Sequence, residues 1–179
     1  LSVSVNAVNN TDGVISTDDA LQLTASTLEN LRGTIQSLSE HIDSMTRIDI
    51  SDFLSNDAGT IQTNNNQFYL AAKNVDNLSI DETLANIIHT GSGDFELTVD
   101  TQLNNSGNLF SGGNFSISAQ SLINESVLSL TNLSLTESLT NSGTIQSQLL
   151  NLDLSGNLNN ENGILSQLSE TQHQINAAN

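Results

Sequence analysis

The chain has 179 residues, enough for one domain with a sizeable core, yet only 36% of them are hydrophobic and 3% are aromatic. Its formal charge of −17, with three Lys and Arg residues in all, excludes nucleic acid as a partner, because phosphate binding needs clustered cations, and disfavours anionic membrane surfaces. The sequence contains no cysteine, which excludes disulfides and zinc–thiolate sites, and no apolar run of transmembrane length, so we expect no membrane insertion.

Three short patterns recur along the chain, and the first is an apolar residue followed two positions later by Asn. In chain order it occurs at Val8/Asn10, Leu28/Asn30, Leu54/Asn56, Leu84/Asn86, Leu103/Asn105, Leu122/Asn124, Leu139/Asn141 and Leu158/Asn160. Asn is typical of turns, because it tolerates a left-handed backbone and bonds to nearby backbone groups. Asn side chains stacked on one another also form amide ladders. We therefore expect a ladder of Asn residues at one corner of a repeating fold.

The second pattern follows each Asn and consists of an aliphatic residue with Ser or Thr two positions later. Its members are Ile15/Thr17, Ile35/Ser37, Ile61/Thr63, Ile88/Thr90, Leu109/Ser111, Val127/Ser129, Ile145/Ser147 and Ile164/Ser166. Both positions should face the interior, since alternate residues of a strand share one face. Glycine precedes most of these pairs, and we expect it to supply the positive φ of a tight corner.

The third pattern is an alternating apolar pair about six or seven residues further on. It occurs at Leu21/Leu23, Phe68/Leu70, Phe95/Leu97, Phe115/Ile117, Leu133/Leu135 and Leu152/Leu154, with Ile42 in its place in the second unit and Ile175 in the last. A period of two indicates strands, so each unit carries about three short strands separated by turns. A unit of about 20 residues buries its apolar face only when units stack in register.

These patterns predict an all-β parallel β-helix of about eight coils of roughly 18–27 residues, forming one domain over residues 1–179. Leucine-rich repeats share the period, but their L-x-x-L-x-L-x-x-N spacing and helical half do not recur. Because the patterns run to both ends of the chain, we interpret it as a segment of a longer protein.

Two units are longer than their neighbours, and we place the extra residues in loops around 45–52 and 73–82. In solenoids, insertions often form the binding face. Charged side chains concentrate in these stretches. We therefore expect the two loops to adjoin and to contact a partner through Arg47, Asp49, Asp52, Lys73, Asp76, Asp81 and Glu82.

A second candidate for partner binding is apolar. The residue between the two inward positions of the second pattern should face solvent, and it is polar at Ser16, Gln36, Gln62, His89 and Gln146. It is apolar at Phe110, Leu128 and Leu165. Exposed apolar residues in near register form partner-binding patches, but scattered surface residues or coverage by a loop are the favoured explanation.

The stretches "LENLRGTIQS", "LNNSGNLFSGGNFSISAQSL" and "LTNSGTIQSQLLNLDLSGNLNNENGILSQ" resemble the haemagglutinin repeats of filamentous-haemagglutinin-like exoproteins of two-partner secretion. The resemblance covers essentially the whole chain and is closest over residues 103–166. This family includes adhesins and contact-dependent growth inhibition effectors. The resemblance implies a right-handed β-helical filament, secreted to the bacterial cell surface outside the outer membrane. It also implies an outer-membrane transporter as export partner, and a protein or glycan receptor on a target cell.

Catalytic motifs give a competing interpretation. The stretch "NTDGVISTDDALQL" resembles the acidic motifs of polygalacturonase-type glycosidases, which also need Gly-His-Gly and Arg-x-Lys motifs. His41, His89 and His173 lie in other contexts, and Ile48-Asp49 follows Arg47. We therefore expect no enzyme, no cofactor and no metal. A β-helical carbohydrate-active enzyme or polysaccharide-binding module is the alternative. Asp18-Asp19 and Asp81-Glu82 leave calcium binding open, with a solvated acidic surface as the favoured interpretation.

Overall fold

The computed structural model describes residues 1–169 and 174–177, which form strands joined by turns and loops. The strands among these residues are β1 (Ser2–Ser4), β2 (Ala7–Asn9), β3 (Val14–Thr17), β4 (Leu21–Glu29), β5 (Thr34–Ser37), β6 (Met45–Ser55), β7 (Thr60–Thr63), β8 (Gln67–Asn77), β9 (Asn86–His89), β10 (Asp94–Asn105), β11 (Asn108–Ser111), β12 (Asn114–Asn124), β13 (Val127–Asn141), β14 (Thr144–Leu154), β15 (Leu158–Asn159), β16 (Ile164–Gln167) and β17 (Gln174–Ala177). In the described ranges, no helix is long and apolar enough to span a membrane.

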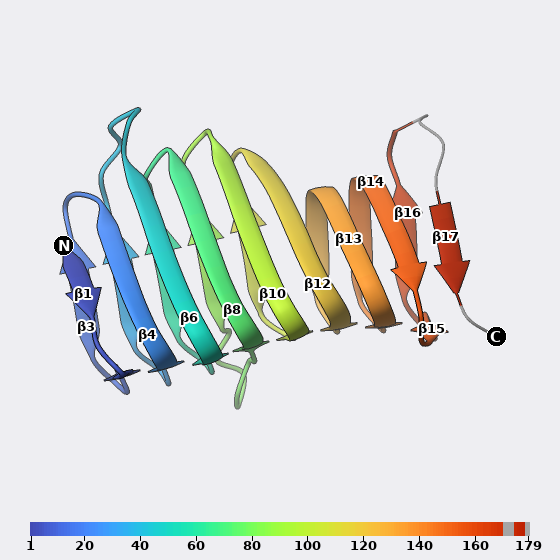
Figure 1. Ribbon diagram of the computed structural model, residues 1–179, viewed down its shortest axis with the longest axis horizontal. Helices are drawn as coiled ribbons and strands as arrows, with labels where there is room; N and C mark the ends of the chain where they lie inside the picture. Colours follow the sequence, from blue (N-terminus) through green and yellow to red (C-terminus); the bar gives the residue numbers. More distant parts are fainter. Residues whose placement is uncertain (170–173, 178–179) are drawn as a thin grey trace.

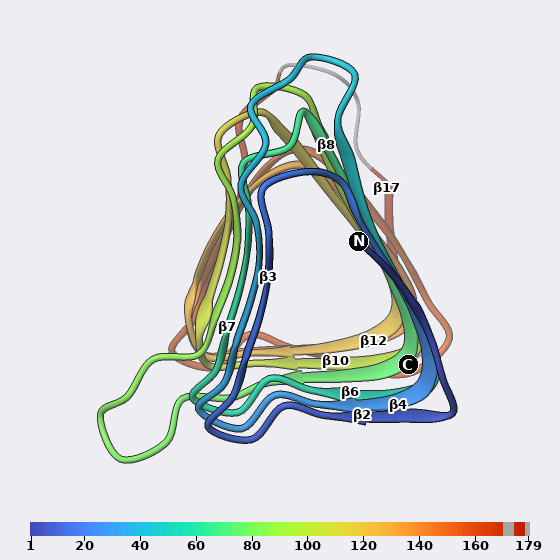
Figure 2. The same cartoon turned by 90° about the vertical axis from the view of Figure 1, so that its left-hand side faces the viewer.

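The strands wind into a parallel β-helix with a triangular cross-section (Figures 1 and 2). One sheet has the order β1-β4-β6-β8-β10-β12-β13-β14-β16, and a second has the order β11-β9-β7-β5-β3. Every strand pair within them is parallel and joins one coil to the next, which confirms the predicted fold. In Figure 2, which views the N-terminal end, the chain turns clockwise as it recedes, so the helix is right-handed.

Each coil has three faces, but the first two share one strand. In β4, residues 21–25 lie on what we call the first face and residues 27–29 on the second face, while β5 lies on the third face. The pairing register shifts between Ala25 and Thr27, and β6, β10 and β12 shift at the equivalent corner. Extra residues of this kind form β-bulges, which bend a strand without ending it. The sequence predicted about three short strands per unit, but in most coils two of these are a single strand that bends at the corner.

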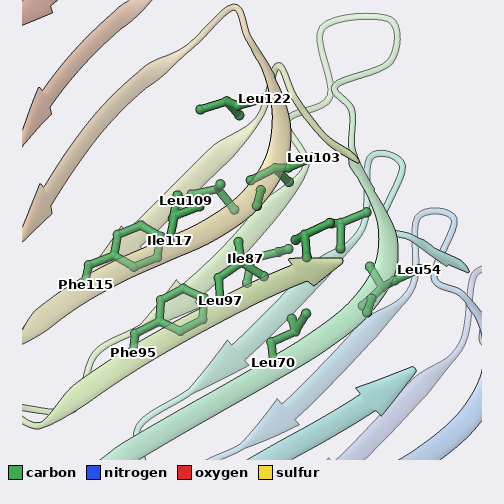
Figure 3. Packing of buried hydrophobic residues seen from close by; sticks show 14 of the residues in the cluster. Leu54, Leu70, Ile87, Phe95, Leu97, Leu103, Leu109, Phe115, Ile117 and Leu122 are labelled. Carbon is green, nitrogen blue, oxygen red and sulfur yellow. The ribbon is translucent and has the colours of Figure 1, made fainter. Parts of the chain in front are cut away.

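The interior is a narrow aliphatic core with one aromatic column. Phe68, Phe95 and Phe115 occupy equivalent positions in successive coils and are fully or almost fully buried. Their ring centroids are 4.5 Å apart at both steps, with interplanar angles of 11° and 3°. Figure 3 shows Phe95 and Phe115 stacked in this way among Leu and Ile side chains. Identical residues at coil spacing thus form a stack that aligns three coils.

A ladder of Asn side chains runs along the corner between the second and third faces, as predicted. Each Asn Nδ2 donates to the Asn Oδ1 of the next coil at 2.7–3.0 Å. The ladder runs through Asn10, Asn30, Asn56, Asn77, Asn105, Asn124, Asn141 and Asn160. Its fourth member is Asn77, so our assignment of Asn86 was wrong. Val75-Asp76-Asn77 also fits the apolar-x-Asn pattern, and the insertion follows it.

The corner glycines serve a different purpose from the predicted one. No described glycine has a positive φ; at several corners the residue before the glycine has it instead, as at Asp12, Arg32 and Ala58 (φ 51–53°). A Cβ built on Gly33 would lie 2.0 Å from the carbonyl oxygen of Asn10 in the preceding coil. The same holds for Gly59 and the carbonyl oxygen of Asn30. Glycine is therefore required because stacked coils approach too closely at this corner for a side chain.

The two long loops lie elsewhere than predicted. Residues 45–52 belong to β6, and the first loop spans residues 38–44 instead. Ile42 lies in this loop and is exposed, so it does not hold the place of an inward pair; Thr46 and Ile48 do. The second loop spans residues 78–85, after β8 rather than within it. The loops project from different corners of the triangle (Figure 2), so they do not adjoin.

Candidate functional site

The charged residues predicted to bind a partner lie in three separate parts of the structure. The first group lies on the first face and at the corner beside it. Arg47 and Asp49 are two residues apart in β6, so both point outward. Arg47 Nε and Nη2 donate to the two oxygens of the Asp49 carboxylate at 2.7 and 2.9 Å. At the adjoining corner, Lys73 Nζ lies 3.9 Å from Asp52 Oδ1, and both side chains are more than half exposed. Exposed pairs of this kind contribute little stability, so all four groups are available to a partner.

Asp76 lies on the second face, away from this group, and accepts a hydrogen bond of 2.7 Å from Asn104 Nδ2. The sequence did not draw attention to its neighbour Asp57. Burial raises the pKa of Asp57, the Ser55 hydroxyl at 3.0 Å opposes that shift, and the Asp76 and Glu29 carboxylates add to it. Asp57 Oδ1 is buried without a hydrogen-bond partner. No motif marks Asp57, because its neighbours come from other coils.

Asp81 and Glu82 form the tip of the 78–85 loop. Ile80 and Thr83 exchange backbone hydrogen bonds of 3.0 and 2.8 Å, and both tip residues have positive φ (47° and 66°). This is the geometry of a two-residue hairpin turn, which usually carries Asn-Gly. Both residues are exposed, and the loop that carries them projects from the corner between the second and third faces (Figure 2). The structure therefore separates this pair from Arg47, Asp49, Asp52 and Lys73.

The predicted apolar patch is correct at Phe110, which is 54% exposed, and wrong at its other two members. Leu128 is fully buried, and Leu165 packs against the core. Their neighbours Val127 and Ile164 face solvent instead, at 66% and 57% exposure. The error has a simple cause: Val127-Leu128 and Ile164-Leu165 are apolar doublets, and period two alone does not say which member is inward.

His89 was assigned to the wrong face for the same reason. Ile87, not Ile88, is the inward partner of Ile61 and Leu109, which places His89 in the interior. Its Nε2 lies 2.8 Å from the Asn65 carbonyl oxygen and its Nδ1 lies 2.9 Å from Ser111 Oγ. Burial lowers its pKa, opposed by backbone hydrogen bonds at Asn65 and Asn66 and by Asp94. The imidazole is therefore part of the core, where burial disfavours its charged form.

Phe110 and Val127 flank a break in the third face. β11 and β13 are not paired, although β10 and β12 of the same two coils are. After β11 the chain uses Gly112-Gly113 to turn onto the first face, whereas β13 continues from one face to the next without a turn. The shorter coil leaves a cleft of about 330 Å³ whose lining includes Phe110, Phe115, Val127 and Gln148.

The acidic pairs do not assemble a metal centre. Asp18 and Asp19 are exposed in the turn before β4, where the backbone N–H of Ala20 donates to Asp19 Oδ1 at 2.8 Å. Nowhere in residues 1–169 and 174–177 do three or more metal-ligating side chains come together. His173, one of the three histidines considered for catalysis, lies outside these ranges.

No protein-family profile, curated protein or solved structure matches this chain. The fold and its Asn ladder place it in the class of parallel β-solenoids.

Proposed function

We propose that the chain is a structural and interaction segment of a large secreted bacterial surface exoprotein. It serves as filament shaft or as receptor-contacting repeats in cell adhesion or contact-dependent growth inhibition. The observation that carries this proposal is the continuous Asn ladder, which joins every coil from Asn10 to Asn160 to the next. A solenoid stabilised by nearest-neighbour contacts extends by adding coils, which is what a rod-shaped spacer requires.

The sequence resemblance supports the same function. The stretch "LENLRGTIQS" contains the end of β4, one rung of the ladder and β5, and the stretch from residue 103 to 122 contains the equivalent parts of later coils. The resemblance therefore follows whole structural units. The net charge of −17 also favours a filament that stays soluble and does not self-associate.

Export tests the proposal. The chain is fused behind the secretion-signal domain of a two-partner exoprotein and expressed with the matching outer-membrane transporter. We expect the chain in the medium, resistant to protease. The variant Asn56→Ala is the matched control, because it weakens the fold without altering the signal domain; it should be exported and then digested faster. Retention of the chain inside cells that export the signal domain alone would contradict the proposal.

One observation favours a second candidate, a carbohydrate-active enzyme. Burial raises the pKa of the Asp57 carboxyl, and the Asp76 carboxylate lies close enough to add to that shift; two neighbouring carboxyls of this kind are what a glycosidase needs for acid and base. Incubation with acidic polysaccharides, with and without calcium, followed by a reducing-end assay separates the two functions. Turnover that Asp57→Asn abolishes would establish the enzyme and overturn the filament proposal.

A further inference from the structure

The corner between the third and first faces carries a cleft that a filament shaft does not need. Three successive coils cross this corner with residues 38–44, 64–66 and 90–93. Because the middle crossing is the shortest, the longer crossings rise on either side of it, as Figure 1 shows above β6, β8 and β10. Between them lies a cleft of about 390 Å³, lined by Glu40, Ile42, Asn64, Asn66, Thr90, Gly91 and Ser92.

The backbone of the solenoid fixes the polar groups of this corner cleft. Asn64 N–H donates to Ser37 O at 2.9 Å, and Thr90 N–H donates to Thr63 O at 2.9 Å. The Thr90 hydroxyl donates to Asn64 Oδ1 at 2.7 Å, which orients that amide. Asn66 N–H bonds to Ser44 Oγ at 3.2 Å, which ties the floor of the cleft to the 38–44 loop. The Asn64 amide and the Thr90 hydroxyl are thus held in place before a ligand arrives, which lowers the entropic cost of binding.

The lining chemistry selects the class of ligand. Side-chain amides and hydroxyls both donate and accept hydrogen bonds, and Glu40 adds a strong acceptor. The cleft lining contains no Lys or Arg, and the chain carries a charge of −17, so phosphates and acidic sugars are repelled. Ile42, at 74% exposure, adds one aliphatic surface at the rim. A saccharide ring matches this set, because its hydroxyls donate and accept while its C–H face is apolar.

We infer that the corner cleft binds a neutral saccharide of one or two sugar units. The volume of the cleft, about 390 Å³, lies at the lower end of the range for small-molecule sites. The inference rests on the proposed function only for the source of the sugar, which would be a glycan on a target surface. Glu40 and Asn64 bind ring hydroxyls, and Ile42 packs on the C–H face.

The test is a titration of the ¹⁵N-labelled chain with cellobiose, lactose, mannobiose and chitobiose, followed by NMR. We expect at least one of them to shift the amide signals of Asn64, Asn66 and Thr90, with a Kd of about 1 mM. Asn64→Ala should weaken binding about tenfold, since a hydrogen bond to a sugar hydroxyl is lost. The matched control Gln146→Ala, on the third face several coils away, should leave the Kd unchanged.

Two further probes decide what else the cleft takes. Sialyllactose and spermidine replace the neutral sugars with an anion and a cation. Shifts produced by spermidine alone would make Glu40 an amine site and overturn the inference, as would the absence of shifts with all four neutral disaccharides. Thr90→Val is a second variant, expected to weaken binding with less change to the fold. Because binding is measured on the purified chain, a failure of export leaves this result unaffected.

Discussion

Breaking the Asn ladder in its middle should cost far more stability than breaking it at its end. Asn56 Nδ2 donates to Asn77 Oδ1, Gly59 O and Asn86 O at 2.8, 3.2 and 3.0 Å, and its Oδ1 accepts from Asn30 Nδ2 at 2.7 Å. Asn56→Ala removes all four bonds from a fully buried site.

The magnitude follows from what is left behind. Asn30 Nδ2 keeps bonds to Gly33 O and Thr60 O, each 3.2 Å, but Asn77 Oδ1 loses its donor inside the core. Net hydrogen bonds contribute about 1 kcal/mol each, so the four lost bonds amount to roughly 4 kcal/mol, and the buried orphaned acceptor adds about 1–3 kcal/mol; Asn56→Ala should therefore lower the unfolding free energy by at least roughly 4 kcal/mol. Asn160, at the partly exposed end, accepts from Asn141 and donates to Gly163 O at 3.0 Å. Asn160→Ala should cost about 1 kcal/mol.

Urea unfolding followed by circular dichroism measures the difference. The midpoint of Asn56→Ala should fall well below that of Asn160→Ala at a similar slope. Equal midpoints for the two variants, or a central variant that unfolds with the unmodified chain, would refute the idea that the ladder is a continuous buried network.

Three further predictions concern single residues. Gly33→Ala should lower the free energy of unfolding by about 1–3 kcal/mol through overpacking, and so lower the urea midpoint. Gly112→Ala should cost far less, because its Cβ would meet backbone at 3.0 Å rather than 2.0 Å. Equal losses for the two variants would contradict the close-approach explanation. Ala58→Gly should raise the free energy of unfolding by about 1 kcal/mol, because alanine is strained at φ 51°. A lowered urea midpoint would show that the strain is absent. Since burial lowers the pKa of His89 in the folded state, the unfolded chain binds the proton more readily, so stability should fall as pH drops below about 6.5. His89→Gln should flatten that part of a melting-temperature profile against pH, whereas an unchanged slope would mean that His89 does not titrate.

The fold could be predicted from the sequence because its signals repeat. Each unit repeats the same three short patterns, so the repeat can still be recognised when one residue is assigned wrongly. The errors fall where a single unit is ambiguous on its own: Ile87-Ile88 and Val127-Leu128 offer two apolar residues for one inward place, and both Asn77 and Asn86 fit the ladder pattern. The choice between Asn77 and Asn86 can be made only when the length of each coil is known.

The candidate site was less predictable, for a physical reason. Sequence spacing says which residues share a strand, but it does not say at which corner an insertion leaves the triangle. The loops predicted around 45–52 and 73–82 were therefore expected to adjoin, although the observed loops, 38–44 and 78–85, lie at different corners. The corner cleft depends on the difference in length between three successive crossings, and Asp57 depends on carboxylates from neighbouring coils. Both are properties of stacking rather than of any one segment.

The missing pairing between β11 and β13 has a mechanical consequence. Every coil boundary from β3 to β11 is closed by backbone hydrogen bonds on three sides, whereas this boundary is closed on two. A rod pulled or bent along its axis concentrates deformation where its cross-section changes and its seams are open. We therefore expect the chain to bend or stretch first at this boundary. If the chain is part of a filament, as we propose, bending at this boundary would let the two sections change direction relative to each other.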